Sequence, residues 1–155
     1  MPKLEPGAKV PPFSLPATGG GSWRLRDAAG RALVIYFYPK DMTSGCTRES
    51  QDFRDLHAAF RKAGAEIVGV SRDSVASHEK FKTKERLPFP LLSDPQEEVC
   101  KLFDVIREKS LYGRKFLGIE RSTFLLDAKG VLRREWRKVK VPGHAEEVLE
   151  AAKSL

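Results

Sequence analysis

Apolar runs alternate along the chain with segments in which hydrophobic residues recur at helical spacing. Residues 32–38 are largely aromatic or β-branched and end at a proline, which predicts a strand buried on both faces of a sheet. Hydrophobic residues at helical spacing then predict a helix over residues 45–63, which Gly64 ends. A second apolar run at residues 66–70 completes a strand–helix–strand unit, whose two strands we expect to be parallel.

The rest of the pattern predicts shorter elements on either side of this unit, whereas residues 104–120 show no clear periodicity. In chain order, these elements are a small N-terminal hairpin around 13–15 and 23–25, a helix from a cap at Asp73 or Ser74 to about Lys84, a short strand near an edge at 90–92, a helix that starts at Asp94-Pro95-Gln96-Glu97, a strand at 122–126, a return strand at 131–137 and a helix at 144–154. This order predicts an α/β fold, with a mixed central sheet flanked by helices, and a single domain over residues 1–155.

Cys46 stands in the first turn of the helix that follows the first buried strand. Unpartnered backbone N–H groups and the positive end of the helix dipole favour the thiolate form of a cysteine there. Thr43 offers a hydroxyl, Pro39 shapes the loop, and Gly45 lets the backbone approach closely. These neighbours favour a reactive thiol. The alternative is a packed structural cysteine, because Cys46 also extends the core-facing stripe of Phe53.

Composition and charge narrow the classes of protein to which the chain can belong. The 28 Lys and Arg residues outnumber the 21 Asp and Glu residues, for a net charge of +7, but acids mostly alternate with them. We interpret the densest basic segment, residues 133–140, as a solvated hairpin and its exit, and expect no nucleic-acid partner. Two cysteines are too few for a disulfide framework, no apolar stretch is long enough to span a membrane, and no secretory signal is apparent. We therefore expect a cytoplasmic protein without a membrane partner.

The histidines do not indicate a metal site. His57, His78 and His144 fall in three separate predicted helices, and none forms a ligand pair with a cysteine at the spacing of a zinc site. We interpret them as surface or packing residues.

Several motifs resemble those of one family. Pro39-x-x-x-Thr43-x-x-Cys46 is similar to the active-site signature of the peroxiredoxins, thiol peroxidases that reduce hydroperoxides. Tyr38-Pro39-Lys40-Asp41 and Gly45-Cys46-Thr47 resemble the bacterioferritin comigratory protein, or Q-type, subfamily, and the segments that match further along are 70–74, 89–94 and 118–127. The resemblance implies a thioredoxin-like fold, a sulfenic acid intermediate on Cys46 and no cofactor. Two positions depart from it: Ser44 replaces a usual proline, and Gln51 stands where many members carry a second, resolving cysteine.

The resemblance also assigns roles around Cys46. Arg121 would reach the sulfur and favour both the thiolate and the transition state, because a guanidinium is always charged and presents several donors in one plane. Thr43 would hydrogen-bond the thiolate and the peroxide, and Pro39 would shield the sulfenate from further attack. Glu49, one helical turn after Cys46, would orient Arg121. The alternatives are a Thr43 that only caps the helix, a surface Arg121, and a Glu49 that complements the helix dipole.

The role of Cys100 decides between two possible catalytic cycles. It neighbours Val99 and Phe103 on a short predicted helix, so one interpretation is a packed, unreactive thiol and a one-cysteine cycle that an external thiol completes. The other is an atypical two-cysteine enzyme in which Cys100 attacks the Cys46 sulfenic acid, for which the Cα atoms must come within about 7 Å.

A rival from another class is a thioredoxin-fold binding module without activity. For the enzyme, the expected partners are a hydroperoxide and a thioredoxin, glutaredoxin or small-thiol reductant, and the expected state is a monomer.

Overall fold

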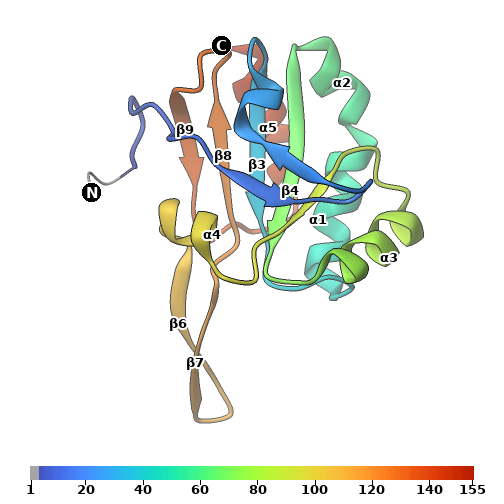
Figure 1. Ribbon diagram of the computed structural model, residues 1–155, viewed down its shortest axis with the longest axis vertical. Helices are drawn as coiled ribbons and strands as arrows, with labels where there is room; N and C mark the ends of the chain where they lie inside the picture. Colours follow the sequence, from blue (N-terminus) through green and yellow to red (C-terminus); the bar gives the residue numbers. More distant parts are fainter. Residues whose placement is uncertain (1–3) are drawn as a thin grey trace.

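A five-stranded mixed sheet crosses the centre of the molecule in the order β5-β4-β3-β8-β9 (Figure 1). The computed structural model describes residues 4–155. Strands β3, β4 and β5 are parallel, as the strand–helix–strand pattern predicts, whereas β8 and β9 run antiparallel to their neighbours. The strand bounds are β3 Ala32–Phe37, β4 Ala65–Ser71, β5 Leu91–Ser93, β8 Ser122–Leu126 and β9 Leu132–Trp136.

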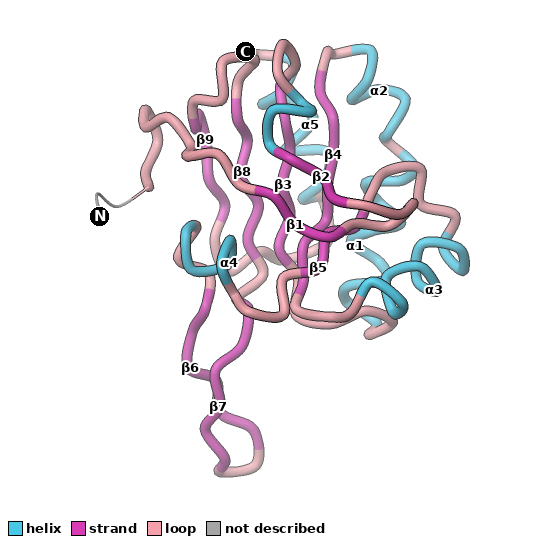
Figure 2. The backbone as a smooth tube through the Cα atoms, in the orientation of Figure 1, coloured by secondary structure: helices cyan, strands magenta, loops and turns pink. Residues whose placement is uncertain are grey.

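Helices cover one face of the sheet, and mostly shorter elements cover the other. The first face packs against α1 (Ser44–Asp55), α2 (His57–Lys62), α3 (Val75–Glu85) and α5 (His144–Lys153). The second packs against α4 (Glu98–Leu102), the hairpin of β1 (Ser14–Pro16) and β2 (Ser22–Arg24), and the short 3₁₀ helix η1 (Leu25–Ala28). Figure 2 shows β1 and β2 crossing in front of the central strands. No helix within the described residues is both long enough and apolar enough to cross a membrane.

Strand β3 divides the hydrophobic core into two clusters, because successive side chains of a strand point to opposite faces. Leu33, Ile35 and Phe37 belong to the cluster under α4, and the alternate residues of the strand belong to the cluster under α1 and α5. Cys46 packs in the second cluster and Cys100 in the first. The sheet therefore lies between the two cysteines.

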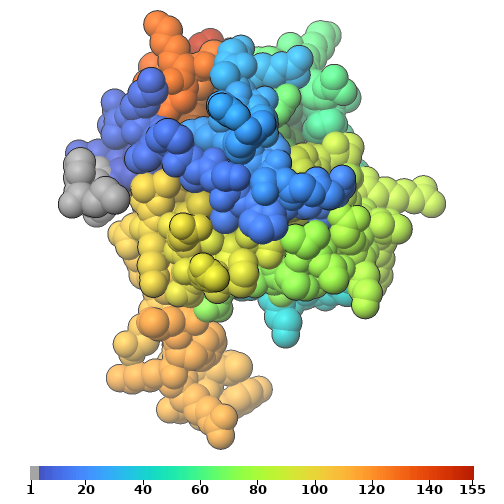
Figure 3. Space-filling model, viewed as in Figure 1, coloured from blue at the N-terminus to red at the C-terminus, as the bar shows by residue number. Residues whose placement is uncertain are grey.

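A two-stranded hairpin, β6 (Ile106–Leu111) and β7 (Arg114–Ile119), projects from the body of the molecule (Figures 1 and 3). Its turn holds Tyr112 and Gly113 with φ of 52° and 78°, as a tight two-residue hairpin turn requires. The sequence interpretation missed this element. Most of the hairpin faces solvent on both sides, so no apolar alternation marks its strands.

Two predicted helices have different bounds in the structure. The helix expected over 45–63 is divided at Leu56 into α1 and α2. The helix expected from Pro95 begins only at Glu98, because Glu97 takes a left-handed conformation with φ of 61° and inserts a turn. Asp94 still caps this helix, since its carboxylate accepts hydrogen bonds from the backbone N–H groups of Glu98 and Cys100 at 2.9 and 2.8 Å.

Candidate active site

Cys46 is the third residue of α1, at the end of the loop that leaves strand β3. Thr43 occupies the N-cap position with extended backbone angles, but its side chain makes no capping hydrogen bond. The sulfur of Cys46 is an unpaired thiol, and only 1% of the residue is exposed. The local sequence thus produces the strand–loop–helix arrangement that the pattern predicts.

Arg121 lies beside this sulfur because of the register between β3 and β8. Phe37, the last residue of β3, pairs with Ser122, the first residue of β8. Arg121, directly before Ser122, therefore lies beside the end of β3, where the chain continues towards Cys46. Its Nη2 donates to Sγ of Cys46 at 3.4 Å, and its Nη1 donates to Oε1 of Glu49 at 2.7 Å. A Cβ on Gly45 would stand 3.1 Å from Nη2, so the glycine leaves room for the guanidinium.

Glu49 is 1% exposed and holds Arg121 from the next turn of α1. Burial raises the pKa of Glu49 to about 7, and the charge and hydrogen bond of Arg121 only partly oppose this. Its second carboxylate oxygen, Oε2, finds no hydrogen-bond partner among residues 4–155. Burial acts to lower the pKa of Arg121, but its charge interactions and hydrogen bonds with Glu49 and Cys46 outweigh burial and raise that pKa. The structure thus brings together Cys46, Glu49 and Arg121.

Thr43 and Pro39 lie in the loop before α1, Thr43 exposed and Pro39 half-buried. The hydroxyl of Thr43 donates its proton to the carbonyl oxygen of Lys40 at 2.9 Å. A hydroxyl has one proton to give, so this oxygen is left to accept a hydrogen bond from a molecule that enters the site.

The sequence analysis assigned no role at this site to three further polar residues, Lys109, His78 and Asp41. Half-buried Lys109, from β6, has a pKa lowered by burial and by the charge of Arg121, while Cys46 acts to raise it. His78 and Asp41 form a buried hydrogen bond of 2.7 Å behind the loop. The interpretation of His78 as a packing or surface residue was incomplete. No spacing rule relates residues 41 and 78, and only the packing of α3 against the loop joins them.

Cys100 has a different environment from Cys46. It is fully buried on the opposite face of the sheet, as the third residue of the short helix α4. Burial, reinforced by the negative charge of Asp94, raises the pKa of its thiol far above the ordinary range. Gln51, at the position of a common resolving cysteine, donates to Glu85 at 2.8 Å.

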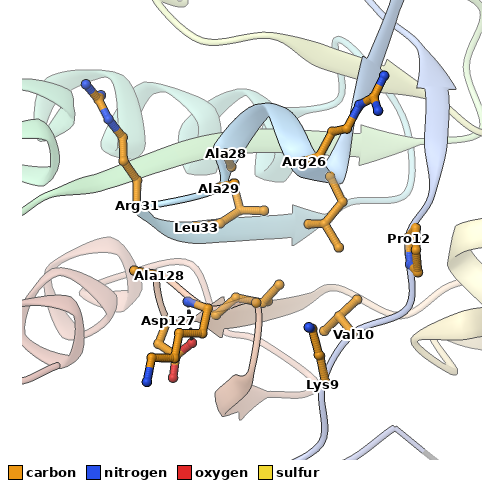
Figure 4. A pocket seen from close by; sticks show the side chains of 14 residues that line it. Lys9, Val10, Pro12, Arg26, Ala28, Ala29, Arg31, Leu33, Asp127 and Ala128 are labelled. Carbon is orange, nitrogen blue, oxygen red and sulfur yellow. Dashed lines mark hydrogen bonds between the residues drawn. The ribbon is translucent and has the colours of Figure 1, made fainter.

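Figure 4 shows a pocket of about 280 Å³, whose lining residues include Leu33 near the start of β3. Leu33 and Leu126 form part of its apolar wall, and Lys9, Arg26 and Arg31 are among its charged lining residues. Since it begins where β3 begins and Cys46 follows where β3 ends, this pocket does not contribute to the thiol site.

Proteins of one family are similar to this chain in sequence. Residues 6–135 match the family model of the AhpC/TSA family. The chain is 57% identical to peroxiredoxin Bcp of Xanthomonas campestris over 144 residues, which cover 92% of this chain and 90% of that protein. It is 48% identical to peroxiredoxin Bcp of Bacillus subtilis over 152 residues, which cover 98% and 97% of the two chains.

Solved structures give the same result for the fold. A cysteine-to-serine mutant of peroxiredoxin Q from Xylella fastidiosa superposes with a TM-score of 0.93 at 42% identity, covering 99% of this chain and 98% of that one. The X. campestris bacterioferritin comigratory protein, studied for its alkyl peroxide reduction activity, superposes with a TM-score of 0.87 at 56% identity, covering 92% and 90%. The thioredoxin-like fold and the family resemblance are confirmed. The chain belongs to the AhpC/TSA family, among the peroxiredoxins of the Bcp or Q type, and is a thiol-dependent peroxidase.

Proposed function

We propose that Cys46 is the nucleophile of this peroxidase and that Arg121, Glu49, Thr43 and Pro39 complete its active site. The thiolate of Cys46 attacks one oxygen of the hydroperoxide while the O–O bond breaks. The sulfur is oxidised to sulfenic acid, and the leaving oxygen takes a proton and departs as water or an alcohol. The single observation that carries this assignment is the contact of Cys46 Sγ with a guanidinium that Glu49 holds in place.

Each neighbour has a separate task in this proposal. Arg121 stabilises negative charge on sulfur and on the leaving oxygen, because its donors are already oriented before the substrate arrives. Glu49 is a positioning residue for Arg121. Thr43 accepts a hydrogen bond from the O–H of the hydroperoxide and so orients its O–O bond. Pro39 limits access to the sulfenate.

We assign the enzyme a one-cysteine cycle. A disulfide between Cys46 and Cys100 would need Cα atoms within about 7 Å, whereas the two residues pack in clusters on opposite faces of the sheet. An external thiol therefore attacks the sulfenic acid, releases water and leaves a mixed disulfide, which a second thiol reduces. This interpretation is favoured over the atypical two-cysteine cycle.

We propose hydrogen peroxide and organic hydroperoxides as substrates, since the X. campestris relative is studied for alkyl peroxide reduction. The reductant is a thioredoxin, a glutaredoxin or a small thiol. A cytoplasmic, reducing setting suits both free thiols.

We also propose that the enzyme is a single-domain monomer. Both edges of the central sheet are protected against pairing with a second copy. Strand β5 is only 3 residues long and is bridged by Ala17, and β9 carries Arg133, Arg134 and Glu135. Light scattering coupled to size-exclusion chromatography tests this state.

A peroxide titration tests the assignment of the nucleophile. Reduced protein receives one equivalent of hydrogen peroxide, and peptide mass spectrometry follows both cysteines over time. We expect one oxygen to be added at Cys46 much faster than to a free thiol in the same buffer. A rate no faster than that of the free thiol would favour the non-catalytic binding module instead.

A further inference from the structure

Asp41 is a buried junction in the loop that leads to Cys46. Only 6% of the residue is exposed, and its carboxylate accepts hydrogen bonds from three side chains. Oδ1 accepts from the hydroxyl of Tyr38 at 2.6 Å, and Oδ2 accepts from the hydroxyl of Ser77 at 2.8 Å and from Nδ1 of His78 at 2.7 Å. Tyr38 directly follows β3, and Ser77 and His78 belong to α3. The Asp41 carboxylate therefore links the loop by hydrogen bonds to the end of β3 and to α3, whereas Cys46 belongs to α1.

Both ring nitrogens of His78 face acceptors. Nε2 lies 2.9 Å from the carbonyl oxygen of Leu92 in β5, and a carbonyl only accepts, so Nε2 carries a hydrogen. Burial acts to raise the pKa of Asp41, but hydrogen bonds from His78, Tyr38 and Ser77 lower it below its ordinary value. Both Asp41 oxygens accept hydrogen bonds from hydroxyl groups, which leaves Nδ1 of His78 as the donor of its 2.7 Å contact with Oδ2. The His78 side chain has no exposed surface, and both of its ring nitrogens are placed to donate.

A second carboxylate holds the backbone of the same loop. Oδ2 of Asp73 accepts from the backbone N–H of Asp41 at 2.8 Å and from the hydroxyl of Ser71 at 2.7 Å. The titratable groups that face His78 are thus Asp41 from the loop, Tyr38 from the end of β3 and Asp73 from the β4–α3 connection, while β5 offers the Leu92 carbonyl.

The loop needs such an anchor because Met42, between Asp41 and Thr43, has a φ of 64°. This left-handed conformation is unfavourable for a residue with a Cβ, and it persists only where the surroundings enforce it. The Met42 residue is 45% exposed, so its own packing supplies little of that constraint. The constraint comes from its neighbours, Asp41 in the buried junction on one side and α1 on the other.

We propose that Asp41 and His78 form a buried carboxylate–imidazolium pair that positions residues 39–43 for peroxide reduction and resists opening of the loop towards the reductant. Both are positioning residues, because they act through the loop and do not touch Cys46 or the peroxide. The proposal rests on the assignment of Cys46 and Thr43 made above. It also follows that the pair affects the two half-reactions in opposite directions. Peroxide reduction needs the loop closed, whereas an external thiol has to reach a sulfur in a residue that is 1% exposed.

Nitrogen NMR of the histidine rings tests the pair without reference to activity. In the reduced full chain at pH 7, we expect both ring nitrogens of His78 to carry hydrogens. In Asp41→Asn, the side-chain amide can donate to Nδ1, so we expect a neutral ring that retains the hydrogen on Nε2. A neutral His78 ring in the unaltered protein would overturn the carboxylate–imidazolium pair.

Single-turnover kinetics test the positioning role. In His78→Asn, we expect the second-order rate with hydrogen peroxide to fall at least ~10-fold, because the loop is displaced from its working geometry. We expect the rate at which a small thiol reduces the preformed Cys46 sulfenic acid to rise. Asp41→Asn, which can keep a hydrogen-bonded pair without charge, should retain more of the peroxide rate than His78→Asn.

The matched control is His144→Asn, which removes another buried histidine, bonded to Thr123 at 2.8 Å on the same side of the sheet. This control substitution should lower stability and leave both rates within about twofold.

If folded His78→Asn keeps the peroxide rate, or if both rates fall together, the positioning role is wrong. If Cys46→Ser retains turnover, the proposed nucleophile fails instead, and the ring protonation measured by NMR is unaffected.

Discussion

Cys46 and Cys100 occupy the same position in two helices and differ in almost everything that controls reactivity. Each is the third residue of its helix, and each is buried, with 1% and 0% of the residue exposed. The sulfur of Cys46 faces the guanidinium of Arg121, whereas Asp94 caps the helix of Cys100 and accepts from its backbone N–H. Exposure and helix position therefore do not separate the two thiols. The sign of the neighbouring charge does.

The largest expected difference between the two cysteines is in turnover. Cys46→Ser replaces the proposed nucleophile by a near-isostere, so we expect a folded protein with no peroxidase activity. Circular dichroism checks the fold, and peroxide consumption with a thioredoxin-type or small-thiol reductant checks the activity. Non-reducing peptide mapping of the unaltered protein after peroxide should show Cys46 as sulfenic or sulfinic acid. A rapid, dominant Cys46–Cys100 disulfide would refute the one-cysteine cycle.

The next largest effect on the peroxide rate is expected at Arg121 and Thr43, two polar residues that we assign to the Cys46 site and that have no counterpart assigned at Cys100. Arg121→Ala and Thr43→Val should each lower the second-order rate with hydrogen peroxide by ~100-fold, the scale for losing one preorganised hydrogen-bonding group. Stopped-flow measurement on the reduced protein gives this rate directly. Lys115→Ala, which removes an exposed cation from the projecting hairpin, is the matched control and should leave the rate unchanged. Unchanged rates in folded Arg121→Ala and Thr43→Val would mean that neither acts on the transition state.

Glu49 should have a smaller effect, a contribution to the free energy of unfolding that depends on pH. Because its folded-state pKa is raised to about 7, its contribution to stability is fully present below the ordinary value and is lost as the pH rises through about 7. The free energy of unfolding should therefore fall by about 3 kcal/mol, relative to Glu49→Gln, between pH 4 and pH 8. Urea unfolding of both proteins in a Cys46→Ser background, which removes thiol titration, tests this. A constant difference across that range would contradict it.

Cys100 should give the smallest effect, confined to stability. Cys100→Ala leaves a small cavity in the cluster under α4, so we expect a loss of about 1–2 kcal/mol in the free energy of unfolding. Turnover with hydrogen peroxide and a small thiol should stay within about twofold. Since burial and Asp94 raise the pKa of Cys100, its alkylation in the folded protein should remain negligible from pH 7 to pH 9. Turnover lost in folded Cys100→Ala would restore the two-cysteine interpretation.

The local hydrophobic pattern was sufficient to predict the strand before Cys46 and the helix that contains it. The apolar run before it and the helical spacing after it give the right kinds of element, and the family motifs lead to Arg121 and Glu49 as neighbours. The hydrophobic pattern did not predict the projecting hairpin, because its strands are largely exposed on both faces and show no apolar alternation. It also misplaced the start of α4, because a turn at Glu97 precedes the helix.

The sequence by itself determined the strand–loop–helix unit that carries Cys46, the order of most later elements and, through its motifs, the family. These depend on neighbours along the chain, whose spacing fixes periodicity, capping and turns. Only the tertiary structure decided that the sheet separates Cys46 from Cys100 and that His78 hydrogen-bonds to Asp41. These relations join residues distant in the chain, and they follow from strand register, side-chain alternation and helix packing, which a local pattern does not specify.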